Sequence, residues 1–177
     1  SRDIQNNADF CSGICCMIAL KEAVLAKDIS LNEIDTTIFY MDMRTFGKSF
    51  QQYHDAAQNK AVAFVRCKIH SLSHDNETGN LVLRYMAPSG ELQREQFDMV
   101  VLSTGQRPGH QMSELSKVCD TGLNPWGFMK TLPFFSTSTE NPGVFVGGSA
   151  SGLKDITESV IHASAAGLNA SQVIISK

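Results

Sequence analysis

The sequence of residues 36–65 is TTIFYMDMRTFGKSFQQYHDAAQNKAVAFV. Residues 36–41 are rich in β-branched and aromatic side chains and follow a polar loop, which is typical of a short buried strand. A helix is expected over residues 48–58, and residues 62–65 are expected to form a second strand. An α/β sheet follows from this order of elements.

Polar and apolar residues alternate in the next part of the chain, in CKIHSLS, LVLRYM and ELQREQF within residues 67–97. Turn-forming clusters separate these runs at residues 76–79 and 88–90, so the pattern predicts an antiparallel three-stranded meander. Residues 97–103, FDMVVLS, are instead a continuous apolar run that ends at Thr104 and Gly105. This run predicts a buried parallel strand that leads into a loop on the ligand side of the sheet.

Helical spacing marks two other segments. Residues 10–27 place apolar side chains at helical intervals, with Asp9 available as the N-cap, so a helix is expected to carry the nearby cysteines in its first turns. A long closing helix is expected from about Asp155. Its apolar face, expected to pack on a sheet, consists of Ile156, Val160, Ala163, Gly167, Ala170 and Ile174.

The segment between these helices predicts a crossing between two domains. Beyond Arg107 and Pro108, glycines and prolines punctuate a stretch with little periodicity, which is typical of loop. One more buried strand is expected at residues 143–146, followed by a turn at Gly147 and Gly148.

Composition excludes several classes of function. The 177 residues are 42% hydrophobic and carry a formal charge of -3 with the two signs interspersed, so we expect no nucleic-acid partner. No apolar run reaches the roughly 18 residues that a membrane span needs, and the first ten residues are too polar for a signal peptide. The expected location is therefore the cytoplasm.

Cysteine spacing indicates a metal or redox site rather than a disulfide framework. Of five cysteines, Cys11, Cys15 and Cys16 lie within the six residues CSGICC, while Cys67 and Cys119 stand alone. Thiolates bind iron and zinc tightly, and the adjacent pair suits a multi-iron cluster better than one tetrahedral zinc ion. Composition alone leaves open a set of buried, inert thiols, because free cysteine packs as a small hydrophobic residue.

Two glycine turns predict a cofactor site. VVLSTGQRP at residues 100–108 and GVFVGGSASGLKDI at residues 143–156 each place an apolar strand before a glycine turn. Asp42 and Arg44 follow the strand at residues 36–41, where dinucleotide folds contact the ribose or its 2′-phosphate, although a solvated loop also explains them. No Ser-His-Asp order or carboxylate pair indicates hydrolysis.

Five segments together resemble one known family. They cover nearly the whole chain in order, and they are SRD (1–3), CSGICCMIALKEA (11–23), IFYMDMRTFGKSF (38–50), FDMVVLSTGQRP (97–108) and GLKDITESVIHASAA (152–166). The sequence is similar to the A subunit of heterodisulfide reductase and its bacterial relatives.

The resemblance implies a thioredoxin-reductase-like architecture, a Rossmann-like FAD/NAD(P)-binding fold with the meander described above. Residues 1–107 would be an inserted NAD(P)-binding-like domain, and residues 108–177 the C-terminal part of the FAD-binding lobe. Cys11, Cys15 and Cys16 match the family motif that helps to hold a [4Fe-4S] cluster near the flavin. Gly105, Gly147, Gly148, Lys154, Asp155 and Ile156 fall on the flavin side of the lobe.

The chain also departs from the family pattern. In relatives a further cysteine precedes the SRD segment, and the N-terminal half of the FAD lobe carries its own G-x-G-x-x-G turn; neither is present, so a fragment truncated at its N-terminus is expected. Both the cluster and the FAD are therefore expected of the intact protein, and the isolated fragment is expected to be inactive.

The function implied by the resemblance is that of one component of a multi-subunit oxidoreductase. It would transfer electrons between FAD and iron-sulfur clusters, with other cluster-carrying redox subunits as partners, and the resemblance allows a homodimer of the intact protein. Two alternatives remain open. One is a cofactor-free assembly module, and the other is an NAD(P)H-dependent disulfide reductase domain, which the absence of a G-x-G-x-x-G turn and a C-x-x-C pair disfavours.

Overall fold

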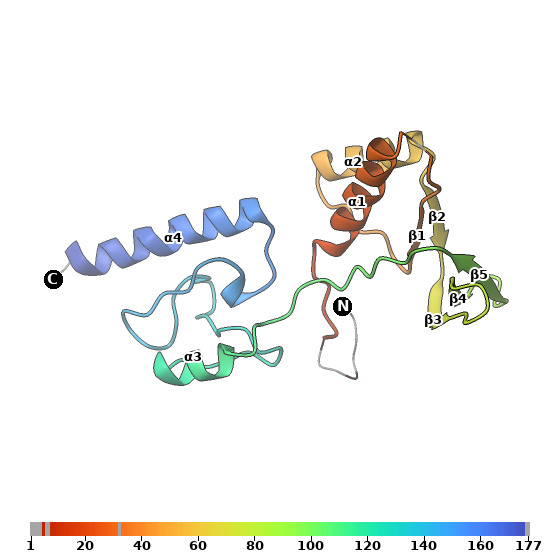
Figure 1. The fold of residues 1–177 in the computed structure, drawn as a ribbon. Helices are drawn as coiled ribbons and strands as arrows, with labels where there is room; N and C mark the ends of the chain where they lie inside the picture. Colours follow the sequence, from red (N-terminus) through yellow and green to blue (C-terminus); the bar gives the residue numbers. More distant parts are fainter. Residues whose placement is uncertain (1–4, 6–7, 32, 176–177) are drawn as a thin grey trace. The chain divides into compact units, whose positions relative to one another are not determined.

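The computed structural model describes residues 5, 8–31 and 33–175, so the SRD segment at residues 1–3 lies outside the described residues. The chain divides into two compact units. We name Cys15–Ser103 the sheet unit, and Ser1–Ile14 together with Thr104–Lys177 the loop unit. Figure 1 labels the α-helices and strands of both units.

A βαβ crossover forms the centre of the sheet unit. β1 (Thr37–Tyr40) and β2 (Ala63–Arg66) pair in parallel, with Thr37 opposite Ala63, and α2 (Lys48–Asn59) connects them. Parallel strands joined by a helix are the building block of Rossmann-like folds. The strand, helix and strand expected at residues 36–65 are confirmed, and each of their ends falls within one residue of its expected position.

The crossover is held by a small apolar core. α1 (Cys15–Ile29) and α2 pack against each other and over the strand pair through Leu20, Ala57 and Val62, which are all buried. Burying such side chains is the main favourable contribution to folding. The N-terminal end of α1 therefore comes to lie beside the turn after β1, as the contact between Cys16 and Asp42 shows.

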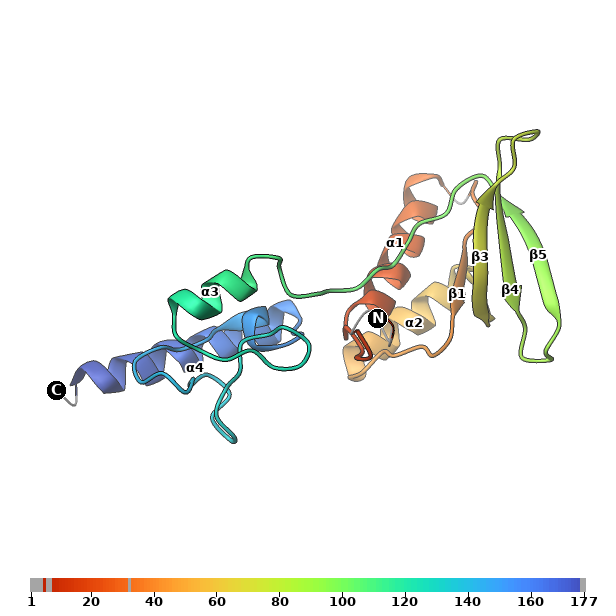
Figure 2. The same ribbon diagram turned by 90° about the horizontal axis from the view of Figure 1, so that it is seen from below.

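The meander is confirmed as an antiparallel sheet. β3 (Lys68–His74), β4 (Leu81–Met86) and β5 (Leu92–Phe97) run side by side with β4 in the middle (Figure 2). Its inner face contributes Leu83 and Tyr85 to a second core, where Phe39 of β1 contacts the Tyr85 ring at 5.1 Å between centroids. The α/β class and the three-stranded meander were thus both predictable from local patterns.

The buried strand expected at residues 97–103 is wrong beyond Phe97, where β5 ends. Residues 98–103 have no strand structure, and Met99, Val101 and Leu102 are 76%, 68% and 69% exposed. A strand exists only through hydrogen bonds to a neighbour, and the part of the chain that the structure describes supplies none for this segment. The segment is therefore apolar, as expected, but exposed.

The loop unit contains α3 (Met112–Val118), the 3-10 turn η2 (Gly148–Ser151) and α4 (Ile156–Ile175). The closing helix is confirmed, whereas α3 falls in a stretch expected to be loop. The strand expected at residues 143–146 is wrong, because only an isolated bridge between Ser138 and Phe145 forms there. No helix among the described residues is both long enough and apolar enough to cross a membrane.

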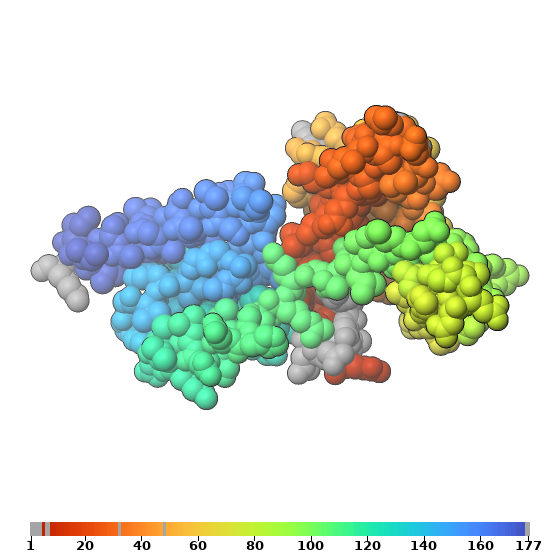
Figure 3. Space-filling view, viewed as in Figure 1, coloured from red at the N-terminus to blue at the C-terminus, as the bar shows by residue number. Residues whose placement is uncertain are grey.

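The packing face of α4 also differs from the expectation. Ile156, Val160 and Ile174 of the expected face are 85%, 61% and 75% exposed, while His162 is the buried residue of the helix. Figure 3 shows one flank of α4 lying along the loop segments of its unit and the other flank open in this view. The helix packs through polar and small side chains, because its docking partner is a loop that offers carbonyl and hydroxyl groups rather than a sheet.

Candidate functional site

The three cysteines of the CSGICC motif carry thiols rather than disulfides, and each is half-buried. α1 begins at Cys15, so the helix expected from residue 10 starts later and only Cys15 and Cys16 lie in its first turn. The backbone of Gly13 has φ +74°, a left-handed conformation that separates Cys11 from the helix. Asp9 is therefore not an N-cap, and its carboxylate instead accepts a hydrogen bond from Trp126 Nε1 at 2.6 Å.

Contacts within the sheet unit fix the two helical cysteines. The Ser103 hydroxyl donates to the Cys15 carbonyl oxygen at 2.8 Å. The Cys16 thiol donates a long hydrogen bond to the Asp42 carbonyl oxygen, with 3.8 Å between the atoms. The first turn of α1 contains no acidic residue, so the positive end of the helix dipole would stabilise thiolates there.

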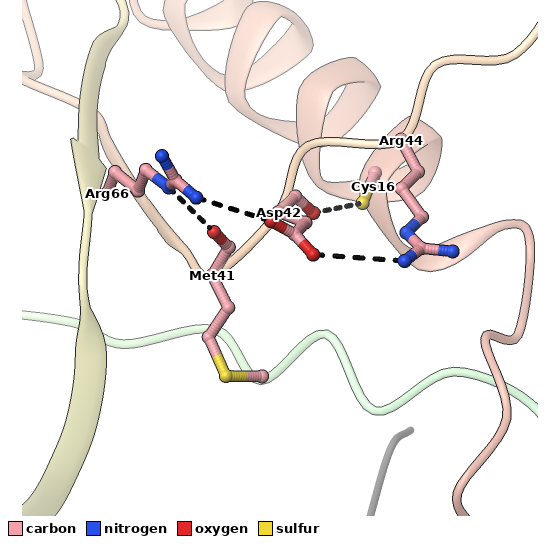
Figure 4. A network of polar contacts seen from close by, with 5 residues as sticks. All are labelled: Cys16, Met41, Asp42, Arg44 and Arg66. Atoms are coloured by element: carbon pink, nitrogen blue, oxygen red, sulfur yellow. Dashed lines mark hydrogen bonds and ion pairs between the residues drawn. The ribbon is translucent and has the colours of Figure 1, made fainter.

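Two arginines hold the turn that faces Cys16 (Figure 4). Arg44 and Arg66 approach the two carboxylate oxygens of Asp42 at 3.8 Å and 3.6 Å, and Arg66 Nε donates to the Met41 carbonyl oxygen at 3.2 Å. The Asp42 carboxylate is thus engaged within its own unit. Both ion pairs are long and exposed, so they contribute little energy and do not discriminate for or against the NAD(P)H-dependent alternative.

The thiols of the motif are suitable ligands for an iron-sulfur cluster. The described residues, however, bring no group of three or more possible metal ligands together. Cysteine thiolates are the ligands that iron-sulfur clusters use. The structure therefore places two thiols at the start of α1 and a third on the segment before it.

Two of the three glycines expected on the flavin side, Gly105 and Gly148, have a left-handed backbone conformation. Gly105 has φ +77°, and a Cβ there would lie 2.7 Å from the Ser12 hydroxyl oxygen. A Cβ on Gly147 would lie 3.6 Å from the Cα of Ala163, an ordinary van der Waals contact, so the packing at this position does not require glycine. Gly148 has φ +63° at the start of η2.

The remaining flavin-side candidates surround the start of α4. The Lys154 ammonium donates to the Ser151 hydroxyl at 3.0 Å. Asp155 and Glu158 form a reciprocal capping box, in which the Glu158 amide donates to Asp155 at 2.7 Å and the Asp155 amide donates to Glu158 at 2.8 Å. Ile156 is largely exposed. The two carboxylates disfavour a phosphate at this helix end and leave it compatible with an uncharged ring edge.

His162 was given no role by the sequence, yet it anchors α4. Its Nε2 lies 2.9 Å from the Ser136 carbonyl oxygen, and seven residues further along the helix Asn169 donates to the Thr137 hydroxyl at 2.6 Å. The seven-residue spacing of His162 and Asn169, which places both on one face of the helix, was the available signal.

Comparison with known proteins gives several relatives, although no protein-family model matches the chain. The A-type iron-sulfur subunit of CoB–CoM heterodisulfide reductase from Methanocaldococcus jannaschii is 37% identical over 170 residues, which cover 94% of this chain and 26% of that protein. The A subunit of the H(2)/formate:CoB-CoM heterodisulfide,ferredoxin reductase of Methanococcus maripaludis is 36% identical, with the same two coverages. Among solved structures, thioredoxin reductase from Streptococcus pyogenes has a TM-score of 0.40 at 18% identity, over 89% of this chain and 49% of that one.

These relatives are named as reductase subunits, so the class of protein that the chain resembles is a component of a redox complex. The chain is a homologue of one segment of the heterodisulfide reductase A subunit, the family indicated by its sequence. It spans about a quarter of the length of the curated relatives that it matches.

Proposed function

We propose that this chain is the cysteine-motif segment of a flavoprotein like the heterodisulfide reductase A subunit, which transfers electrons between FAD and a [4Fe-4S] cluster. The observation that carries the proposal is that the cysteine motif is present as three half-buried thiols in a chain 37% identical to an iron-sulfur protein of this family. Redox subunits that carry further clusters are the proposed partners.

Each candidate residue has a proposed part in this function. Cys11, Cys15 and Cys16 would be cluster ligands, and the start of α1 would favour the thiolate forms of Cys15 and Cys16. Gly105, Gly147, Gly148, Lys154, Asp155 and Ile156 would lie on the flavin side, in the two domains proposed for residues 1–107 and 108–177. When bound, the flavin exchanges electrons in pairs and the cluster exchanges them singly, which links two-electron and one-electron chemistry.

The test is to measure iron, acid-labile sulfide and the visible spectrum after anaerobic reconstitution. The chain is compared with a version extended upstream by the strand that carries the further cysteine of the relatives. Single serine substitutions at Cys11, Cys15 and Cys16 should each reduce the iron content, whereas Cys119→Ser, which removes a half-buried free thiol outside the motif, should not.

The cofactor-free assembly module makes the opposite prediction. Its spectrum would be colourless in both the original and the extended form, and all four serine variants would behave alike. That result would overturn the proposed function.

A further inference from the structure

The segment around Cys11 is bound to the loop unit by contacts on both sides of the thiol. Ala8 and Ser12 are both 1% exposed, although they belong to a short stretch without helix or strand. Irregular segments are usually exposed, so burial of this kind requires specific partners. We refer to residues 8–13 as the cysteine arm.

Aromatic contacts hold the arm on its N-terminal side. The Phe10 ring meets Trp126 edge-on at 6.1 Å between centroids and an interplanar angle of 79°, and it meets Phe128 at 5.9 Å and 66°. Such edge-to-face pairs are favourable beyond the area they bury. The Asp9 carboxylate adds the hydrogen bond from Trp126 Nε1, so one tryptophan contacts two consecutive residues of the arm.

A close backbone approach holds the arm on its C-terminal side. The Ser12 side chain occupies the space in which a Cβ on residue 105 would stand, with its Oγ 2.7 Å and its Cβ 2.8 Å from that position. Only glycine at residue 105 permits this contact. Cys11 lies between the two anchors, one residue from Phe10 and one from Ser12.

We propose that Phe10, Trp126 and Gly105 are positioning residues, which seat the cysteine arm on the loop unit and so fix where the Cys11 thiol is presented. Only one part of this inference rests on the proposed function, namely that the seating presents the Cys11 thiol to a cluster. The seating itself is a property of the chain without any bound group.

The seating can be measured directly on the reduced chain by alkylation with iodoacetamide. The rate at each cysteine is read by mass spectrometry, with fragmentation to separate Cys11 from its neighbours. Phe10→Ala should raise the Cys11 rate about tenfold, because two ring contacts no longer oppose opening of the arm. Cys119, half-buried in the same unit, serves as the internal reference and should not change.

Two further variants sharpen the measurement. Phe134→Ala is the matched control, because it makes the same substitution in the same unit at a fully exposed ring. Phe10→Tyr keeps the ring and should restore the slow rate. Equal Cys11 rates in Phe10→Ala and Phe134→Ala would overturn the proposed seating.

The link to the proposed function is tested on the extended, reconstituted chain. Phe10→Ala should hold less iron and sulfide than Phe134→Ala, and the reduced cluster that remains should show a shifted EPR spectrum. Faster Cys11 alkylation with unchanged iron and EPR would overturn the positioning role while leaving the proposed function intact. A colourless parent chain would overturn the proposed function and the positioning role together, and alkylation would still report the seating.

Discussion

Replacing Gly105 with alanine should destabilise the loop unit more than any other single glycine substitution near the motif. The left-handed backbone at φ +77° costs a non-glycine residue about 1–2 kcal/mol. The added Cβ would also stand 2.7 Å from Ser12 Oγ, and overpacking of this kind costs about 1–3 kcal/mol. The sum is roughly 2–5 kcal/mol.

The variant Gly127→Ala separates the cost of the left-handed backbone from the cost of overpacking. It has φ +87°, but its nearest neighbour, Cγ of Pro108, would lie 3.5 Å from a new Cβ, an ordinary contact. Gly127→Ala should therefore cost only the conformational part, about 1–2 kcal/mol.

Urea unfolding followed by fluorescence measures both variants, because Trp126 is the only tryptophan and lies in this unit. Adding Ser12→Gly removes both obstructing atoms, so it should reduce the cost of Gly105→Ala by about 1–3 kcal/mol in a double-mutant cycle. Equal costs for the two alanine variants, or additive costs within about 0.5 kcal/mol in the cycle, would refute the contact between Ser12 and Gly105.

Three other outcomes are expected. Asp155→Ala breaks the capping box of α4 and should cost about 1 kcal/mol in the same urea assay, while the exposed mid-helix Ser164→Ala should cost nothing measurable. In a spectrophotometric titration Tyr85 should ionise above the ordinary tyrosine pKa of 10.0, because its hydrogen bond to Glu95 and its burial raise its pKa to about 12. The contribution of the neutral Tyr85 side chain to the free energy of unfolding is therefore fully present below the ordinary tyrosine pKa of 10.0, and it is lost as the pH rises towards 12. A loss of this contribution between pH 6 and 8 would contradict the prediction. Burial raises the pKa of the Cys67 thiol, so Cys67 should be alkylated more slowly than Cys119, and the difference should vanish in urea.

Local patterns predicted the sheet unit well, and long-range contacts explain what they missed. The alternation in β3, β4 and β5 and the segment from β1 to β2 are readable because each element's own periodicity specifies it. Residues 98–103 carry the same apolar signal as a strand, but a strand also needs a neighbour, which a local pattern cannot reveal.

The start of α1 shows the same limit. Residues 10–14 fit a helical pattern, yet Phe10 contacts Trp126, which lies 116 positions along the chain, and Gly13 takes a left-handed backbone. The buried His162 was missed because its partner is a loop carbonyl oxygen at Ser136. The ligand roles assigned to the cysteines depend on a bound cluster, so these site residues stay predictions.

The boundary between the units falls between Ile14 and Cys15, inside the motif. Cys11 is therefore held by the contacts of the cysteine arm, whereas Cys15 and Cys16 are held by α1, Ser103 and the turn at Asp42. The two sets of contacts share no residue. A short, continuous sequence motif can thus depend on two separate packing environments, which is why its spacing alone predicts the ligand type but not the geometry.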